Sequence, residues 1–280
     1  MHLNIFVSNN CFVYCKGCYS YSREEKISKL LPSENIINFL EYAYKLGIKK
    51  VTICGGDPLT RKDIIELLKR IKSIGFKISL DTLGTNIIKD VKMKNKIVYN
   101  KISAKELSEL VDVIGIPIDG SNNQIIKLFR PTNMDIINNQ IKVCEELSKY
   151  NASICINTVV YKGNLNDANN ICNLIKTLKI KEWQLFQFEP LGKFGLLNRK
   201  MFEITDEEFS KYKKEILKNF QDNNIKITFK NNNDRINKYM LIDNFGNAWV
   251  PFLEKNNRKI IGNIKNRENW QDICSYINNV

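Results

Sequence analysis

The eight residues CFVYCKGC, at positions 11–18, hold three of the chain's eight cysteines. They follow residues 2–8, an apolar run with the composition of a β-strand, and they lie in the polar stretch that ends it. Thiolates at this spacing, Cys11, Cys15 and Cys18, can surround one metal centre from a single loop. A structural zinc site is closed by four ligands. Three thiolates on a [4Fe–4S] cube instead leave one iron open to a ligand that is not protein.

The composition predicts a globular protein that does not enter a membrane. A chain of 280 residues, 43% hydrophobic and 26% charged, is long enough to bury a sizeable core. Its N-terminus does not have the basic-then-apolar pattern of a signal peptide, and no apolar run approaches the roughly 18 residues of a membrane span. We therefore expect a cytoplasmic protein whose cysteines are reduced ligands or buried thiols rather than disulfides.

The net charge of +13 raises the question of a nucleic-acid partner. The excess is mostly lysine, spread over the whole chain beside abundant asparagine and isoleucine. No basic run is interleaved with aromatic residues, as single-strand binding requires. The charge pattern therefore disfavours nucleic acid as the main partner.

Strand and helix signals alternate along the first 190 residues. Such alternation favours a parallel sheet with crossover helices, and six strands are too few for a closed eightfold barrel. The predicted fold is α/β: a partial (β/α)6 TIM-type barrel over residues 1–195 and a small C-terminal α/β appendage over 196–280, which begins with a linker at 192–204. Pro117 predicts a bulge or a sheet edge in the fourth strand. The six strands are expected at residues 2–8, 50–54, 76–83, 113–118, 152–160 and 183–188.

Polar and glycine-rich residues gather where these predicted strands end. The carboxyl ends of parallel barrel strands meet at one mouth, where ligands bind. We therefore expect these residues to form one site. They are the cysteine loop, Gly55 to Asp57, Thr85, Asn86, Asp119, Asn157, and Glu189 with Gly192.

The pair of motifs Cys11-x3-Cys15-x2-Cys18 and Gly55-Gly56-Asp57-Pro58 resembles the radical S-adenosylmethionine (SAM) superfamily. The resemblance implies that the three cysteines hold a [4Fe–4S] cluster whose open iron chelates the amino and carboxylate groups of SAM. Reduction then cleaves SAM to a 5′-deoxyadenosyl radical that abstracts a hydrogen atom. Two positions depart from the family pattern: Gly17 stands where an aromatic residue is usual, and Asp57 stands in place of glutamate.

Further likeness is to the peptide-modifying branch of that superfamily with a SPASM or twitch tail. Ile118-Asp119-Gly120-Ser121, Arg130-Pro131 and Asn157-Thr158-Val159 follow the order of that branch. The likeness implies that Gly55, Gly56 and Asp57 approach the SAM amino group and that Arg130 pairs with the SAM carboxylate. By the same likeness, Ser79, Asp119 and Asn157 are further cofactor-binding candidates.

The tail resembles the segment that carries auxiliary-cluster cysteines in that branch, but it does not have those cysteines. Phe252 stands where a cysteine is expected after Pro251, and Cys274 is the only cysteine beyond Cys172. One thiol cannot hold a cluster. We therefore predict a degenerate appendage without cluster ligands, and one cluster in total.

Cys155 is the candidate for a further chemical role. Alternation along a strand places it on the same face as Asn157, so it could donate a hydrogen atom to a substrate radical, as in an epimerase. A small buried core thiol is the alternative.

The predicted function is radical SAM chemistry on a peptide, with an electron donor such as flavodoxin or ferredoxin. A small molecule or nucleotide as substrate is the second reading. The third is a zinc-bearing, basic nucleic-acid-binding protein whose site is completed by Cys54 or His2.

Overall fold

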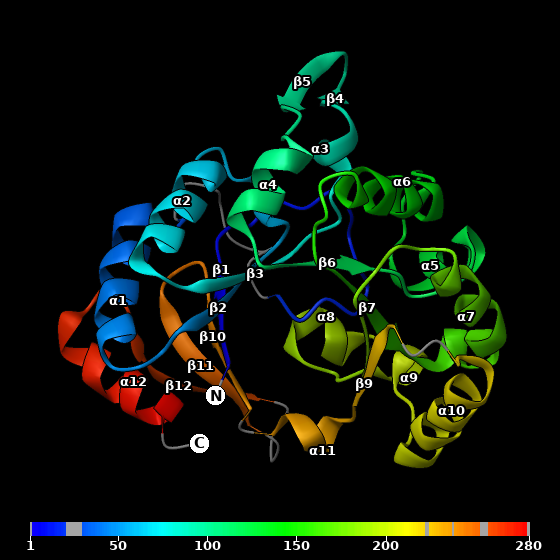
Figure 1. Ribbon diagram of the computed structural model, residues 1–280. Coiled ribbons are helices and arrows are strands. Elements are labelled where there is room, and N and C mark those ends of the chain that lie inside the picture. The colour runs from blue at the N-terminus through cyan, green and yellow to red at the C-terminus, as the bar shows by residue number, and fades with distance from the viewer. Residues whose placement is uncertain (1, 21–29, 222–223, 237, 253–256, 279–280) are drawn as a thin grey trace.

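The computed structural model describes residues 2–20, 30–221, 224–236, 238–252 and 257–278. Its main sheet has ten strands in the order β12-β11-β10-β1-β2-β3-β6-β7-β8-β9 (Figure 1). The strands of this sheet are β1 (His2–Phe6), β2 (Lys50–Cys54), β3 (Lys77–Asp81), β6 (Val113–Pro117), β7 (Ile154–Val160), β8 (Glu182–Gln187), β9 (Lys226–Lys230), β10 (Tyr239–Ile242), β11 (Asn247–Phe252) and β12 (Asn257–Asn263).

The six strands from β1 to β8 run parallel and alternate with helices, so the α/β partial barrel that the sequence predicts is present. The helix bounds are α1 (Ser33–Lys45), α2 (Ile64–Ile74), α3 (Thr85–Ile88), α4 (Ala104–Leu110), α5 (Asn123–Phe129), α6 (Ile136–Ser148), α7 (Ala168–Lys176), α8 (Gly192–Leu197), α9 (Arg199–Phe202), α10 (Asp206–Asn219), α11 (Asn232–Arg235) and α12 (Trp270–Asn278), with short 3-10 turns at Pro58–Thr60, Lys162–Asp167 and Arg267–Asn269. The helices α1, α2, α4, α6, α7 and α10 lie on the outer face of the curved sheet (Figure 1).

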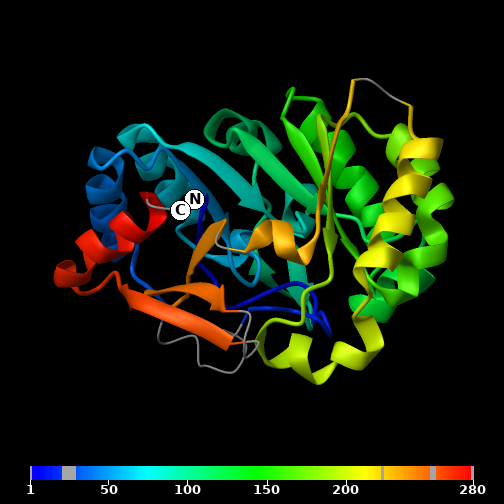
Figure 2. The same cartoon turned by 90° about the horizontal axis from the view of Figure 1, so that it is seen from below.

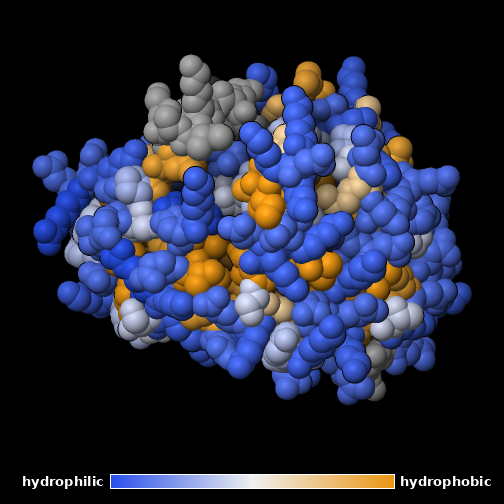
Figure 3. Space-filling view, turned by 90° about the horizontal axis from the view of Figure 1, so that it is seen from above, coloured by the Kyte–Doolittle hydropathy of each residue, from blue (hydrophilic) through white to orange (hydrophobic). Residues whose placement is uncertain are grey.

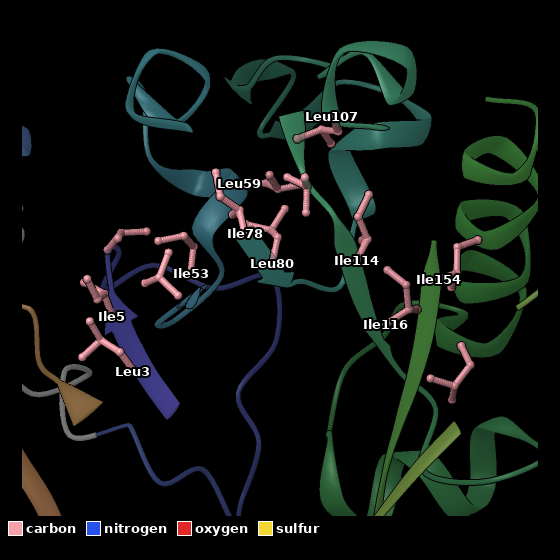
Figure 4. Packing of buried hydrophobic residues seen from close by; sticks show 14 of the residues in the cluster. Leu3, Ile5, Ile53, Leu59, Ile78, Leu80, Leu107, Ile114, Ile116 and Ile154 are labelled. Atoms are coloured by element: carbon pink, nitrogen blue, oxygen red, sulfur yellow. The ribbon is translucent and has the colours of Figure 1, made fainter. Parts of the chain in front are cut away.

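Alternation along each strand divides the side chains between the helices and the barrel interior. The helix-facing side chains are aliphatic and fully buried, and they form one continuous core with the helices (Figure 4). They include Leu3 and Ile5 of β1, Ile78 and Leu80 of β3, and Ile114 and Ile116 of β6. The residues between them, such as Asp81, Gly115 and Asn157, therefore face the interior.

Pro117 is not at a bulge or a sheet edge, so that prediction is wrong. It is the last residue of the central strand β6, opposite Asn157 of β7. Proline is tolerated there because Pro117 lies beyond Gly115, the last residue of β6 that pairs with β3, so no amide hydrogen is needed on that side. The next residue, Ile118, resumes the ladder by donating its amide hydrogen to the carbonyl oxygen of Asn157.

The C-terminal residues continue the same sheet. β9 pairs parallel with β8 at one edge of the barrel, and β10 pairs parallel with β1 at the other. The short helix α11 lies between them, on the side where the six-stranded barrel is open (Figure 2). β11 and β12 extend the β10 edge as antiparallel strands, and α12 packs beside α1. The side chain of Phe252, at the end of β11, lies outside the described residues.

Two stretches differ from the expected secondary structure. Residues 192–204, expected as a linker, contain the helices α8 and α9, whose apolar side chain Phe202 is buried beside the cysteine loop. Residues 91–99 form an unexpected antiparallel hairpin of β4 (Val91–Met93) and β5 (Lys96–Tyr99). It projects from one end of the barrel (Figure 1), and Figure 3 looks down on that end of the molecule.

Candidate active site

The cysteine loop is fixed by backbone pairing to the glycine motif that follows β2. Gly56 donates its amide hydrogen to the carbonyl oxygen of Ser8 at 2.7 Å, and Asp57 donates to that of Asn10 at 2.6 Å. A Cβ atom on Gly56 would lie 2.1 Å from the Asn10 oxygen, and Gly55 has a φ of +137°. Glycine is thus required because the segment leading into Cys11 lies directly against this turn. The sequence motif alone does not reveal this contact.

The departure at Gly17 has a steric explanation in the walls of the loop. A Cβ atom there would lie 2.4 Å from the ring of Phe129 and 2.7 Å from that of Phe188. These two rings, with Phe202, pack against one another beside the cysteines. The space beside Gly17 is therefore filled by aromatic side chains from other elements.

Arg130 connects the cysteine loop with the end of the fourth barrel strand. Its Nε donates a hydrogen bond to Asp119 Oδ2 at 2.5 Å, and its Nη1 lies 3.1 Å from Cys15 Sγ. Asp119 is fully buried and also accepts from the amide of Val159, which fixes the carboxylate. The Asp119 carboxylate raises the pKa of Arg130 above its ordinary value, against the effect of burial. A permanent positive charge thus stands beside the cysteine loop, where it favours anionic ligands.

Asp57 binds parts of the protein itself with its carboxylate. Oδ1 accepts hydrogen bonds from the Leu59 amide and the Thr82 hydroxyl, and Oδ2 accepts from the Leu83 amide. Burial raises the pKa of Asp57 to about 6, although these three donors lower it in part. The side chain therefore joins the turn after β2 to the segment after β3. The Asp57 backbone, rather than its carboxylate, is the part that contacts the cysteine loop.

Asp81, which the sequence analysis missed, lies at the centre of the barrel interior. Its Oδ1 accepts a hydrogen bond from Asn157 Nδ2 at 3.0 Å, across the intervening strand β6. This bond passes over Gly115, where a Cβ atom would lie 2.1 Å from Asp81 Oδ1. Burial raises the pKa of Asp81 to about 6. The sequence signal for Asp81 was the two-residue alternation of a strand, which places Asp81 on the same face as Ser79.

Cys155 lies beside this pair, on the interior face of β7. Its Sγ is 3.6 Å from Asn157 Oδ1, so the two side chains share a face as the alternation predicts. The thiol is 2% exposed, and burial raises its pKa to about 12. It therefore carries its hydrogen at neutral pH. Ser79 lies two residues before Asp81 in β3 and therefore on the same face. It is opposite Thr52 of β2 and Val113 of β6.

The donor set suits an iron–sulfur cluster better than a single zinc ion. Cys11, Cys15 and Cys18 are not joined in disulfides, and in the described ranges no three His, Cys, Asp or Glu side chains converge as around one ion. Each thiolate of a cube binds a different iron, so its sulfurs stand further apart. The ligands considered for zinc lie elsewhere: the His2 ring bonds Thr52 at the opposite end of β1, and Cys54 packs on Phe6 and Trp249.

A partial barrel with three thiols at its mouth defines a class of cluster-dependent barrel enzymes. The comparisons with known proteins identify the family within that class. The model of the Radical SAM superfamily matches residues 5–175, and the chain belongs to this superfamily. It is accordingly an enzyme, and its cofactors are SAM and a [4Fe–4S] cluster.

Curated relatives at low identity are named for nucleotide chemistry. The chain is 26% identical over 252 residues to an S-adenosylmethionine-dependent nucleotide dehydratase of Flammeovirga pacifica, which covers 87% of this chain and 80% of the relative. It is 30% identical over 176 residues to a probable GTP 3′,8-cyclase of Pyrococcus abyssi, covering 62% of this chain and 52% of the relative. The chain thus spans about half of that second relative.

Solved structures of similar fold cover the tail as well as the barrel. The Streptococcus suis protein SuiB bound to S-adenosylmethionine superposes with a TM-score of 0.70 at 15% identity, over 96% of this chain and 64% of SuiB. The protein anSMEcpe with bound AdoMet superposes with a TM-score of 0.69 at 17% identity, over 99% of this chain and 82% of that protein. At these identities the likeness establishes the fold. Among the described residues, no helix is long and apolar enough to cross a membrane.

Proposed function

We propose that Cys11, Cys15 and Cys18 hold the cluster and that the chain cleaves SAM reductively at the mouth of the barrel. The observation that carries this proposal is the placement of Arg130, whose guanidinium lies 3.1 Å from Cys15 Sγ and is held by Asp119. When bound, the reduced cluster and SAM supply a 5′-deoxyadenosyl radical, which removes a hydrogen atom from the substrate.

The chain's own residues then bind and orient the cofactor and the substrate. Arg130 has the planar donor geometry that binds a carboxylate with two hydrogen bonds, so we assign it to the carboxylate of SAM. The backbone of Gly55, Gly56 and Asp57 is assigned to its amino group. Ser79 and Asn157, which face the interior, are assigned to its ribose, and Asp119 acts by positioning Arg130.

The substrate that the interior supports best is a small polar molecule of the nucleotide class. Lys230 of β9 faces the interior, where its Nζ donates to the amide oxygen of Gln184 at 2.6 Å. Burial lowers the pKa of Lys230, and the neighbouring Glu182, Cys155 and Asp81 raise it in part. An ammonium group bound to an amide rather than a carboxylate can still bind a phosphate. The names of the two curated relatives point to the same substrate class.

A peptide, the substrate expected from the sequence, is the second candidate. Its support is the fold: SuiB bound to its precursor peptide SuiA superposes on 88% of this chain with a TM-score of 0.59. For either substrate we assign residues 196–280 to closing the open side of the barrel, as a SPASM- or twitch-like tail without a second cluster.

Cys155 is proposed to return a hydrogen atom to the substrate radical. The S–H bond breaks as a C–H bond forms on the substrate, which leaves a thiyl radical. That radical then takes one electron from the protein electron donor and a proton from water. The raised pKa of Cys155 keeps the hydrogen on the sulfur, and its position beside Asn157 places it in the interior.

The central assignment is tested by iron content and by SAM cleavage. Anaerobically purified protein should hold about four irons per chain and form 5′-deoxyadenosine with dithionite as the reductant. The triple variant Cys11→Ala, Cys15→Ala and Cys18→Ala should lose both, whereas Cys274→Ala, which removes a core thiol, should retain both. If the triple variant still held iron and cleaved SAM, the cluster assignment would be wrong.

The substrate class is tested by the stimulation of SAM cleavage. Nucleoside triphosphates should increase 5′-deoxyadenosine formation in the wild type, and Lys230→Gln should remove this increase without changing uncoupled cleavage. Stimulation by unstructured peptides alone would favour the second candidate. In deuterated water, deuterium should enter the product in the wild type and not in Cys155→Ala, and equal incorporation in both would exclude Cys155 as the donor.

A further inference from the structure

The β4–β5 hairpin is an exposed and strongly basic element. Residues 89–101 contain five lysines, Lys89, Lys92, Lys94, Lys96 and Lys101, and a single carboxylate, that of Asp90. All five lysines are exposed. Within the described parts of the chain, none of them forms an ion pair. With five lysines and one carboxylate, this element therefore carries a net positive charge.

Apolar side chains lie among these lysines. Met93 is 65% exposed, Ile97 50% and Val98 40%. Across the hairpin Lys92 is opposite Ile97, and Met93 is opposite Lys96. Each pair therefore places one apolar and one charged side chain next to each other, and the two pairs lie on opposite faces of the hairpin. Figure 3, which views the end from which the hairpin projects, shows apolar patches set among a hydrophilic surface.

The base of the hairpin is anchored to the segments that form the cofactor site. Asn86 Nδ2 donates to the carbonyl oxygens of both Asn100 and Leu59, so it ties the hairpin to the turn after β2. Asp90 accepts from the amide of Lys101 and closes the hairpin neck. These bonds fix the hairpin relative to the glycine motif.

Tyr99, at the end of β5, contacts the cysteine loop directly. Its ring packs edge-on against that of Phe12, with the centroids 5.6 Å apart, and Phe12 lies between Cys11 and Cys15 in the sequence. Tyr14 of the same loop is 72% exposed. The basic hairpin and the cysteine loop thus form one continuous surface, which we call the hairpin face: residues 89–101 with Phe12 and Tyr14.

We propose that the hairpin face is the docking surface for an acidic protein that carries a one-electron redox centre. This inference rests on the proposed cluster at Cys11, Cys15 and Cys18. Lysines beside apolar side chains fit an acidic protein surface, because opposite charges steer the encounter and apolar contacts hold the complex. The site lies against the loop that holds the electron acceptor. One electron leaves the reduced centre of the partner and enters the cluster, with no change in bonding.

A nucleic acid is the other polyanion that a basic surface can bind, but the hairpin face fits it less well. Single-strand binding uses aromatic side chains on which bases stack. The hairpin face offers one strongly exposed ring, that of Tyr14, because the rings of Tyr99 and Phe12 pack against each other. The hairpin face also adjoins the cysteine loop. A partner that delivers an electron to the proposed cluster must bind near this loop, whereas a nucleic acid delivers none.

The test compares a protein reductant with a chemical one on the holoenzyme. The variant is the charge reversal Lys92→Glu, Lys94→Glu and Lys96→Glu. Its control carries the same change of charge on the exposed side of the distant helix α10, as Lys211→Glu, Lys214→Glu and Lys218→Glu. Stopped-flow absorbance measures the rate at which reduced flavodoxin, reduced ferredoxin or dithionite reduces the cluster, at low and at physiological ionic strength.

At low ionic strength, we expect one or both protein carriers to reduce the cluster of the hairpin variant at least about tenfold more slowly than that of the wild type. The rate for the hairpin variant should lose most of its salt dependence, while reduction by dithionite and iron content are unchanged. The α10 control should behave like the wild type. A second variant, Met93→Ser with Ile97→Ser, should weaken carrier binding without altering charge.

The proposal is overturned if the hairpin variant accepts electrons from both carriers at the wild-type rate, or if the α10 control is slowed equally. It is also overturned if neither carrier reduces the wild-type cluster while dithionite does. Tighter binding of a single-stranded oligonucleotide than of either carrier, lost in the hairpin variant, would assign the face to nucleic acid. Failure of dithionite to support SAM cleavage in the wild type would instead contradict the proposed function.

Discussion

Replacing Gly56 by alanine should detach the cysteine loop from the rest of the site. The added Cβ would lie 2.1 Å from the carbonyl oxygen and 2.7 Å from the carbonyl carbon of Asn10. Both atoms belong to the backbone, so no side chain can rotate to relieve the overlap. The segment from Ser8 to Asn10 must move by about 1 Å to restore an ordinary contact.

The size of the effect follows from the contacts that this movement breaks. Overpacking of a well-packed site costs about 1–3 kcal/mol. The hydrogen bonds from the amides of Gly56 and Asp57 to Ser8 and Asn10 contribute roughly 1 kcal/mol each. We therefore expect Gly56→Ala to lower the free energy of unfolding by about 3–5 kcal/mol. The loop that carries Cys11 is displaced at the same time, so iron binding should fall as well.

Urea unfolding of the apoprotein and iron content after reconstitution measure the two effects separately. Gly195→Ala is the matched control, because it lies in α8 and its Cβ would meet no atom closer than 3.2 Å. The control should remain within about 1 kcal/mol of the wild type and bind iron normally. If Gly56→Ala unfolds like the control and retains its iron, the backbone contact does not fix the loop.

Three further predictions follow from the site. Arg130→Lys should weaken SAM binding by at least about tenfold, because an ammonium cannot bind a carboxylate as a planar fork does, and equilibrium dialysis with labelled SAM measures this. Gly115→Ala should separate Asp81 from Asn157 and reduce SAM binding, with a cost in stability of only about 1 kcal/mol in urea unfolding, because the Asp81 side chain can rotate away. Burial raises the folded pKa of Asp57 and Asp81 to about 6, so the folded state retains protons that the unfolded state releases, and stability should fall as the pH rises from about 4 to about 6. Asp57→Asn should remove part of that slope in unfolding measured across this pH range.

The parts of the site that could be predicted from the sequence are those in which local pattern determines position. The cysteine spacing and the glycine motif each follow a strand directly, and parallel strands bring their carboxyl ends together. Asn157 and Cys155 share a face because alternation in a strand allows no other arrangement. These inferences need only short stretches of chain and one rule of sheet geometry.

The parts that could not be predicted depend on contacts between distant stretches. Asp81 was missed because the apolar run continues to Leu83, beyond the observed end of β3 at Asp81. The residues predicted at the end of this strand were therefore Thr85 and Asn86. Those residues are buried, and Asn86 anchors the hairpin instead. Residues 91–99 look like a lysine-rich loop. The hairpin turns at Lys94 and Asn95, which both have positive φ, and the sequence signal for such a turn was weak because neither residue is glycine.

The tail shows why a boundary drawn from sequence need not divide a structure. The regular alternation of strand and helix signals ends near residue 190, but β9 extends the β8 edge and β10 extends the β1 edge of the same sheet. Arg235 of α11 joins the two sides, because it binds Glu189, which follows β8, and Glu189 also accepts from the hydroxyl of Tyr239 at the start of β10. Residues 1–195 alone would expose two unpaired strand edges and the buried interior between them. The tail strands therefore extend both edges of the barrel sheet, and Lys230 of β9 reaches the interior because β9 pairs with β8.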